Sequence, residues 1–71
     1  MAGKGHRVSG LTPRQLDVLA LAAEGKTNKG IGLVLGIKSD TVKNHLNDAF
    51  VVLRARTRTE AVAKALQRGW L

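Results

Sequence analysis

The chain of 71 residues contains no cysteine. This excludes a disulfide framework and a thiolate zinc site, and it fits a reducing compartment such as the cytoplasm. His6 and His45 lie far apart in the sequence, so we expect no metal and no cofactor. The longest apolar run, Val18–Ala23, is far shorter than the ~20 residues that cross a bilayer. We therefore expect a soluble, unexported, cytoplasmic protein without a membrane partner.

Acidic residues are scarce. Five Asp and Glu oppose 12 Lys and Arg, which gives a net charge of +7. The expected partner is a polyanion such as nucleic acid, because each neutralised phosphate releases condensed counterions. The alternative is that the cations serve only solubility. Between residues 26 and 58, only Asp40 and Asp48 oppose the following cations: Lys26, Lys29, Lys38, Lys43, Arg54, Arg56 and Arg58.

No segment has the alternation of a strand, whereas apolar residues recur at three- and four-residue spacing. The sequence therefore predicts an all-α, compact four-helix domain over residues 11–71. Residues 1–10 are rich in glycine and lack apolar periodicity, which indicates a flexible basic arm or a linker remnant.

The first helix is marked by Thr12 as N-cap, Pro13 at the first helical position and Gln15 closing a capping box. We expect it to end near Glu24, with Gly25 as C-cap. Its buried stripe is predicted to be Leu16, Leu19, Ala20 and Ala23.

A short second helix is predicted from the cap Thr27 to about Leu35, followed by a left-handed turn at Gly36. Gly30 and Gly32 should weaken it, each by ~1 kcal/mol relative to alanine. The residues expected to point inward are Ile31, Val34 and Leu35.

The third helix is predicted over about residues 39–53, with Ser39 or Asp40 as its cap. Asp48 should pair with a neighbouring cation, although its carboxylate could instead accept from a cytosine N4 group. The predicted apolar face is Val42, Leu46, Ala49, Phe50 and Leu53, and the opposite face is Lys43, Asn44, Asn47, Asp48 and Val51.

A fourth helix should open with a capping box at Thr57–Glu60 and close at Arg68–Gly69. Trp70 and Leu71 either pack back on the first helix or join a surface for a partner helix. The predicted apolar face is Ala61, Val62, Ala65 and Leu66, which Ala63 broadens.

Two capped helices joined by a glycine turn, with Lys and Asn on the free face of the second, predict a helix-turn-helix that enters DNA. Lys43 could donate to guanine O6 and N7, and Asn44 or Asn47 could pair with adenine N6 and N7. The alternative for an exposed helical asparagine is simple solvation.

Several motifs in this order resemble the C-terminal DNA-binding domain of LuxR-type regulators (the LuxR/GerE/FixJ group). They are Leu11–Arg14, Ala23–Gly25, Thr27–Lys29, Leu35–Ile37, Thr41–His45 and Arg58–Val62. The resemblance implies a sequence-specific transcription regulator in which helices 2 and 3 form the helix-turn-helix. It also implies that helix 4 forms a weak homodimer on an inverted repeat of double-stranded DNA.

The resemblance carries residue roles with it. Lys43, Asn44 and Asn47 are expected to contact bases. Val62, Ala63 and Leu66 are expected to form the dimer surface. Phosphate contacts are expected from Thr27, Asn28, Lys29, Lys38, Thr41, His45, Arg54, Arg56 and Arg58.

Some positions depart from the family pattern. Gln15 and Val52 replace charges that ordinarily complement each other across helices 1 and 3, and Lys38 replaces the serine that usually caps helix 3. Where the family pattern has Glu-Ile-Ala in helix 2, this chain has Gly30-Ile31-Gly32. In helix 3, Ala49 beside Phe50 suggests that core volume has moved by one position.

No Ser/His/Asp arrangement and no phosphate-binding glycine loop is present, so we expect neither an enzyme nor a small-molecule site. One alternative is a promoter-binding module like region four of sigma factors, which works within RNA polymerase. A second is a DNA-binding-deficient partner that inhibits full-length regulators by dimerising with them. RNA polymerase also stays open as a partner of the regulator itself.

Overall fold

A computed structural model of the chain describes residues 10–71. It contains the helices α2 (Pro13–Ala23), α3 (Asn28–Leu35), α4 (Ser39–Leu53) and α5 (Arg58–Gln67), and this part of the chain has no strand. The predicted all-α, four-helix domain is confirmed. The predicted arm over residues 1–10 lies outside the described residues except for Gly10.

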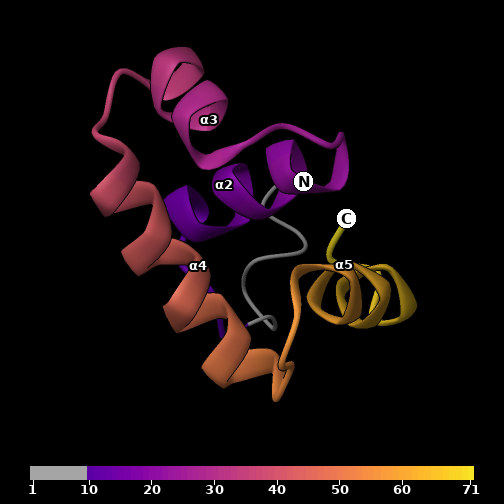
Figure 1. The fold of residues 1–71 in the computed structure, drawn as a ribbon. Coiled ribbons are helices and arrows are strands. Elements are labelled where there is room, and N and C mark those ends of the chain that lie inside the picture. Colours follow the sequence, from indigo (N-terminus) through magenta and orange to yellow (C-terminus); the bar gives the residue numbers. More distant parts are fainter. Residues whose placement is uncertain (1–9) are drawn as a thin grey trace.

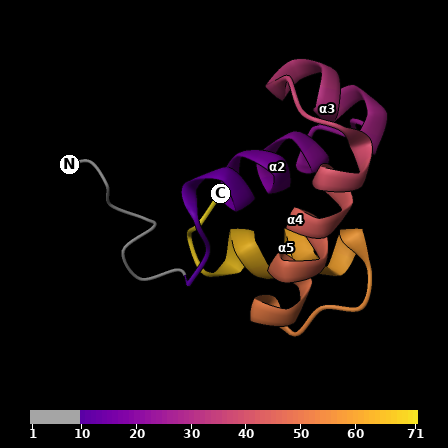
Figure 2. The same ribbon diagram turned by 90° about the vertical axis from the view of Figure 1, so that its left-hand side faces the viewer.

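The longest helix, α4, packs against α2, α3 and α5. Figure 1 shows α4 along the left edge of the view, with α2 and α5 to its right and α3 above. Figure 2, turned by 90°, shows α2 lying above α4 and α5. The core between them is made of Leu11, Val18, Leu19, Ala22, Ile31, Val42, Leu46, Ala49, Leu53, Ala61 and Ala65.

Threonine begins three of these four helices. The hydroxyls of Thr12, Thr27 and Thr57 each accept from the backbone amide three residues later, at 3.0–3.1 Å. The capping box of α2 is complete, because Gln15 Oε1 accepts from the Thr12 amide at 3.0 Å. Only half of the capping box predicted for α5 is present. The Thr57 hydroxyl accepts from the Glu60 amide, but the Glu60 carboxylate accepts from the Arg56 amide rather than from the Thr57 amide.

The predicted cap of α4 is wrong. Lys38 occupies the N-cap position and Ser39 is already helical, so no side chain accepts from the first amides of α4. The reason is the short turn after α3, which brings the chain into helical geometry one residue before a hydroxyl is available.

Gly36 ends α3 in the left-handed conformation, at φ 72°, as predicted. Gly32 lies where α3 meets the following turn, and a Cβ there would lie 2.5 Å from the carbonyl oxygen of Ile37. Glycine therefore permits a backbone approach that alanine would block. Val34, predicted to point inward, is 57% exposed, because the backbone contact at Gly32 takes the inward side of this short helix.

The buried stripe of α2 differs from the predicted one. Val18, Leu19 and Ala22 are buried, Leu16 and Ala20 are half-buried, and Ala23 is exposed. The helix is therefore rotated by about one residue from the predicted orientation. Because Val18–Ala23 is apolar throughout, periodicity alone did not determine which side faces the core.

The chain after α5 returns to the core. The amides of Gly69 and Trp70 donate to Leu66 and Ala65 carbonyls at 3.1 and 2.9 Å, which closes the helix in a Schellman motif. Trp70 and Leu71 pack against the core, which favours the first of the two predicted roles. The apolar face of α5 is confirmed for Ala61 and Ala65, whereas Leu66 is 56% exposed.

The two glycines of α3 give a matched test. We expect Gly32→Ala to lower the free energy of unfolding by about 1–3 kcal/mol, because its Cβ meets backbone rather than a movable side chain. Gly30→Ala, whose Cβ has its nearest contact at 3.4 Å, should be neutral or stabilise by up to ~1 kcal/mol. Urea denaturation followed by circular dichroism measures both, and equal stability of the two variants would contradict the close approach.

Candidate nucleic-acid interface

One side of α4 is exposed. Val42, Leu46, Ala49 and Leu53 are buried, which fixes the rotation of the helix. The predicted opposite side is confirmed as exposed, and we call it the free face of α4: Lys43, Asn44, Asn47, Asp48 and Val51. Figure 1 shows α4 along the edge of the domain, and of these five residues Asp48 contacts α2, through a hydrogen bond from Gln15. The three predicted base-contacting residues therefore share one accessible surface.

The start of α3 gathers the next group of predicted contacts. Thr27 Oγ1 accepts from the Gly30 amide at 3.0 Å, and a hydroxyl that accepts one bond can still donate its proton to another acceptor. Lys29 is exposed and Asn28 is half-buried. Backbone amides, a hydroxyl and an ammonium group thus meet at a helix N-terminus, which suits an anion.

Arg58 ties the start of α5 to this same turn. Its guanidinium donates to the Lys26 carbonyl at 3.0 Å and, in a short hydrogen bond, to Asn28 Oδ1. These bonds join residues 30 or more positions apart in the sequence. Because Asn28 Oδ1 accepts from Arg58, its NH2 group is left to donate elsewhere.

The start of α4 differs from the starts of the other helices, since no side chain caps it. Lys38 at the N-cap is exposed, and Thr41 in the first turn is half-buried. His45 is also half-buried, at the edge of the free face of α4. Uncapped amides beside an ammonium group are suited to a phosphate oxygen.

The loop between α4 and α5 is held by a small polar network. Lys64 Nζ donates to the Arg54 carbonyl at 2.8 Å and lies 3.3 Å from Glu60 Oε2. The Arg56 amide donates to Glu60 Oε1 at 2.8 Å, and this bond, together with the Lys64 side chain, lowers the pKa of the Glu60 carboxyl. The network fixes the loop backbone while the Arg54 and Arg56 side chains stay exposed.

Arg54 adopts a left-handed conformation, at φ 56° and ψ 44°, and is the only described residue other than glycine with a positive φ. This ends α4 abruptly. The cost of such a conformation for a residue with a Cβ is about 1 kcal/mol or more.

Asp48 does not have the predicted cationic partner. Among the described residues it forms no ion pair, and its Oδ2 accepts from Gln15 Nε2 at 3.4 Å. Gln15 is neutral, so it can donate where a carboxylate would repel. The departure at Gln15 was visible in the sequence, but its link to Asp48 depends on how α2 is rotated against α4.

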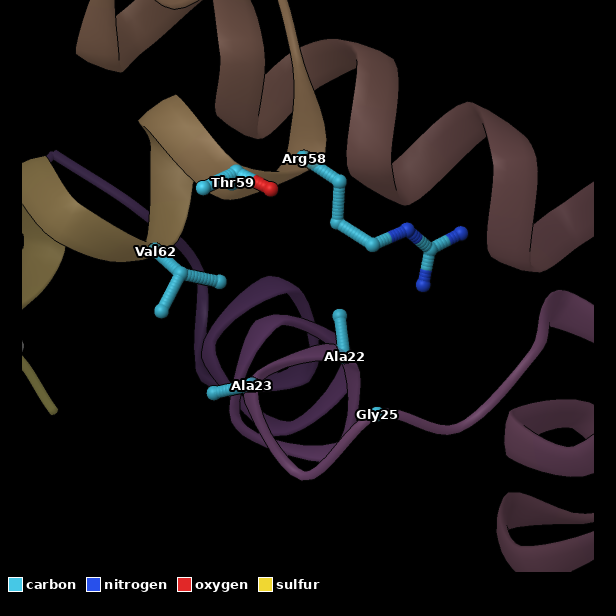
Figure 3. A pocket seen from close by; sticks show the side chains of 6 residues that line it. All are labelled: Ala22, Ala23, Gly25, Arg58, Thr59 and Val62. Atoms are coloured by element: carbon cyan, nitrogen blue, oxygen red, sulfur yellow. The ribbon is translucent and has the colours of Figure 1, made fainter.

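The predicted dimer residues lie along one side of α5. Val62 is half-buried, whereas Ala63 and Leu66 are exposed. Beside them is an open pocket of about 330 Å³ between the end of α2 and the start of α5, lined by Ala22, Ala23, Gly25, Arg58, Thr59 and Val62 (Figure 3). Small apolar side chains form most of its wall, and the Arg58 guanidinium points past it toward the chain after Gly25.

Residues 10–71 hold no group of three or more His, Cys, Asp or Glu side chains placed to bind a metal ion. None of the helices in that range is long and apolar enough to span a membrane.

A short helix, a tight glycine turn and a second helix with one buried and one polar face define a helix-turn-helix DNA-binding domain. Residues 9–65 match the model of the family described as bacterial regulatory proteins, luxR family. The chain belongs to this family and is the DNA-binding domain of a transcription regulator, not an enzyme. The match also decides against the sigma-factor alternative.

Similar proteins support the assignment. The chain is 43% identical over 61 residues to the uncharacterized transcriptional regulatory protein YvfU of Bacillus subtilis. The matched region covers 86% of this chain and 30% of YvfU. It is 51% identical over 59 residues to the quorum sensing-dependent transcriptional regulator RpaR of Rhodopseudomonas palustris. The matched region covers 83% of this chain and 24% of RpaR. The chain thus spans less than a third of the length of these curated relatives.

The bonds of Arg58 make a testable claim about stability. Arg58→Ala should lower the free energy of unfolding by about 1–2 kcal/mol, because it removes two charge-assisted hydrogen bonds, one exposed and one partly buried. Arg56→Ala is the matched control, since the network uses only its backbone amide, and it should cost less than ~0.5 kcal/mol. Chemical denaturation of both variants measures the difference, and two equal midpoints would refute the structural role of Arg58.

Proposed function

We propose that this domain reads double-stranded DNA in a sequence-specific manner, with α4 in the major groove. The observation that carries the proposal is the free face of α4, where Lys43, Asn44 and Asn47 are exposed together opposite a fully buried side. Lys43 donates to guanine O6 and N7, and the asparagine amides pair with adenine N6 and N7.

Phosphate contacts position the domain in this proposal. The start of α3 supplies Thr27, Asn28 and Lys29. The uncapped start of α4 supplies Lys38 and Thr41, and His45 follows one turn further along α4. Arg54 and Arg56 reach the flanking backbone from the loop after α4. For Arg58 we propose an indirect role, because its hydrogen bonds orient Asn28 so that the Asn28 NH2 group is free to donate.

Dimerisation on an inverted repeat is the second part of the proposal. Leu66 is 56% exposed on α5, beside Ala63 and Val62, and the pocket next to Val62 supplies a concave surface. This apolar strip on α5 is small, so we expect the dimer to be weak in solution and to form on DNA, where two half-sites raise the effective concentration. Such a regulator works in the cytoplasm beside a promoter, which makes RNA polymerase the proposed further partner.

Base reading is tested by selection from random duplex DNA at two salt concentrations. The wild-type domain should enrich an inverted repeat, and the Lys43→Ala, Asn47→Ala double variant should not. The control is Arg68→Ala, Gln67→Ala, which removes one cation and one carboxamide from the end of α5 and should retain the enriched motif.

A different result would contradict the proposal. Weak binding of equal strength by wild type and the Lys43→Ala, Asn47→Ala variant, with steep salt dependence and no enriched sequence, would leave only a basic surface. That outcome would favour a domain that inhibits full-length regulators by dimerising with them.

Dimerisation is tested with the selected site. Leu66→Glu should lower the affinity for the full inverted repeat by about tenfold or more, to the level of a single half-site, because it places charge in an apolar contact. Affinity for the single half-site should not change. Leu33→Glu is the control for added charge, since Leu33 is 77% exposed on α3, and sedimentation of both variants without DNA reports the oligomeric state independently. Full cooperativity in Leu66→Glu would rule out α5 as the interface.

A further inference from the structure

Asp48 is one of three acidic residues within residues 10–71 that form no ion pair, the others being Glu24 and Asp40. Asp17 and Glu60 pair with cations at 3.8 and 3.3 Å. Asp40 lies in the first turn of α4, where the helix dipole favours a negative charge. Asp48 lies on the exposed side of the proposed reading helix, and the hydrogen bond it accepts comes from a neutral amide. Within residues 10–71, Asp48 therefore has no ion-pair partner.

The carboxylate nevertheless has a hydrogen-bond partner on α2. Gln15 Oε1 accepts from the Thr12 amide at 3.0 Å, so the capping box of α2 fixes which end of the Gln15 amide faces α4. The other end, Nε2, donates to Asp48 Oδ2 at 3.4 Å. One side chain thus closes the cap of α2 and orients an acid on α4. A glutamate at position 15 could not do both, because it has no proton to donate at neutral pH.

The position of Asp48 on α4 places it next to the proposed base contacts. It follows Asn44 by four residues, so the two side chains are neighbours on one helix face. At 1.5 Å per residue they are about 6 Å apart along the axis, roughly the height of two base pairs. If Asn44 reads a base, Asp48 faces the next one or two pairs.

The groups that a carboxylate can meet in the major groove are few. Phosphates repel it, and so do the acceptors of guanine and thymine. Adenine presents its amino group beside the N7 acceptor, whereas cytosine presents its N4 amino group with no acceptor of its own on the same edge. Cytosine is therefore the base that suits Asp48 best.

We propose that Asp48 is a specificity-determining residue that accepts a hydrogen bond from cytosine N4, and that Gln15 is its positioning residue. This proposal rests on the proposed function, since it requires α4 to lie in the major groove. A fixed negative charge lowers affinity for DNA in general, and it recovers that loss only where an amino group is present. Asp48 therefore acts on specificity rather than on total affinity.

The test compares the base preferences of four proteins in the same selection: wild type, Asp48→Asn, Gln15→Glu and Asp17→Asn. Wild type should enrich cytosine at one position of each half-site. Asp48→Asn, a change of nearly equal volume at an exposed site, should lower that preference by about tenfold and leave the other positions unchanged. Asp17→Asn removes the same charge from α2 and should keep the cytosine preference.

Gln15→Glu separates positioning from folding. Its carboxylate can still accept from the Thr12 amide, so α2 keeps its cap, but it repels Asp48. The cytosine preference should fall at the same position as in Asp48→Asn, an effect that a purely structural role would not localise to one base. Thermal unfolding of all four proteins confirms that they are folded.

Two outcomes would overturn the inference, and they differ from each other. If Asp48→Asn keeps the cytosine preference and binds every sequence more tightly by a uniform factor, Asp48 only repels phosphate, and the proposed function stands. If wild type enriches no motif at all, the proposed function fails and the role of Asp48 fails with it.

Discussion

The close approach of Gly32 to the Ile37 carbonyl determines how α3 and α4 meet, and the interface depends on it. With no side chain between the two backbones, the turn at Gly36 stays short and α4 begins directly at Ser39. The rest of the core then fixes the rotation of α4, because Val42, Leu46, Ala49 and Leu53 are all buried on its inner side. The free face of α4 is a consequence of this packing, and it needs no separate structural device.

Hydrogen bonds between side chains and distant backbone carbonyls add stability that the small core alone does not provide. A domain of this size buries only about 60% of its unfolded surface, so single contacts carry a large share of the stability. The bonds of Arg58 to the turn before α3 and the bond of Lys64 to the Arg54 carbonyl both hold loops next to the proposed DNA surface. These bonds tie the loops to the helices before any ligand arrives, and a surface that is already ordered loses less entropy on binding.

The sequence predicted the elements well because their ends carry local chemistry. Threonine caps, a proline at the first helical position and the glycine at position 36 mark helix ends through bonds to near neighbours, and all of these were confirmed. The cap of α4 and the capping box of α5 were local errors, whereas the other errors arose where the outcome depends on distant residues. The rotation of α2 follows from its contacts with α4 and α5, and the exposure of Val34 follows from the backbone contact at Gly32. For the site, the sequence predicted which side of α4 is free, but it did not predict that Arg58 bonds to Asn28 or that Asp48 bonds to Gln15.

The link between Gln15 and Asp48 shows how one neutral side chain can serve both the fold and the proposed DNA surface. Gln15 and Val52 are both uncharged, so no ion pair joins α2 and α4 at these two positions. The Gln15 amide connects the two helices instead, through its hydrogen bond to Asp48 on the exposed side of α4. Because surface ion pairs contribute only about 0–1 kcal/mol, a charged pair at positions 15 and 52 would add little stability. A neutral amide at position 15 therefore costs the fold little, and it leaves the charge of Asp48 available at the surface where bases are proposed to lie.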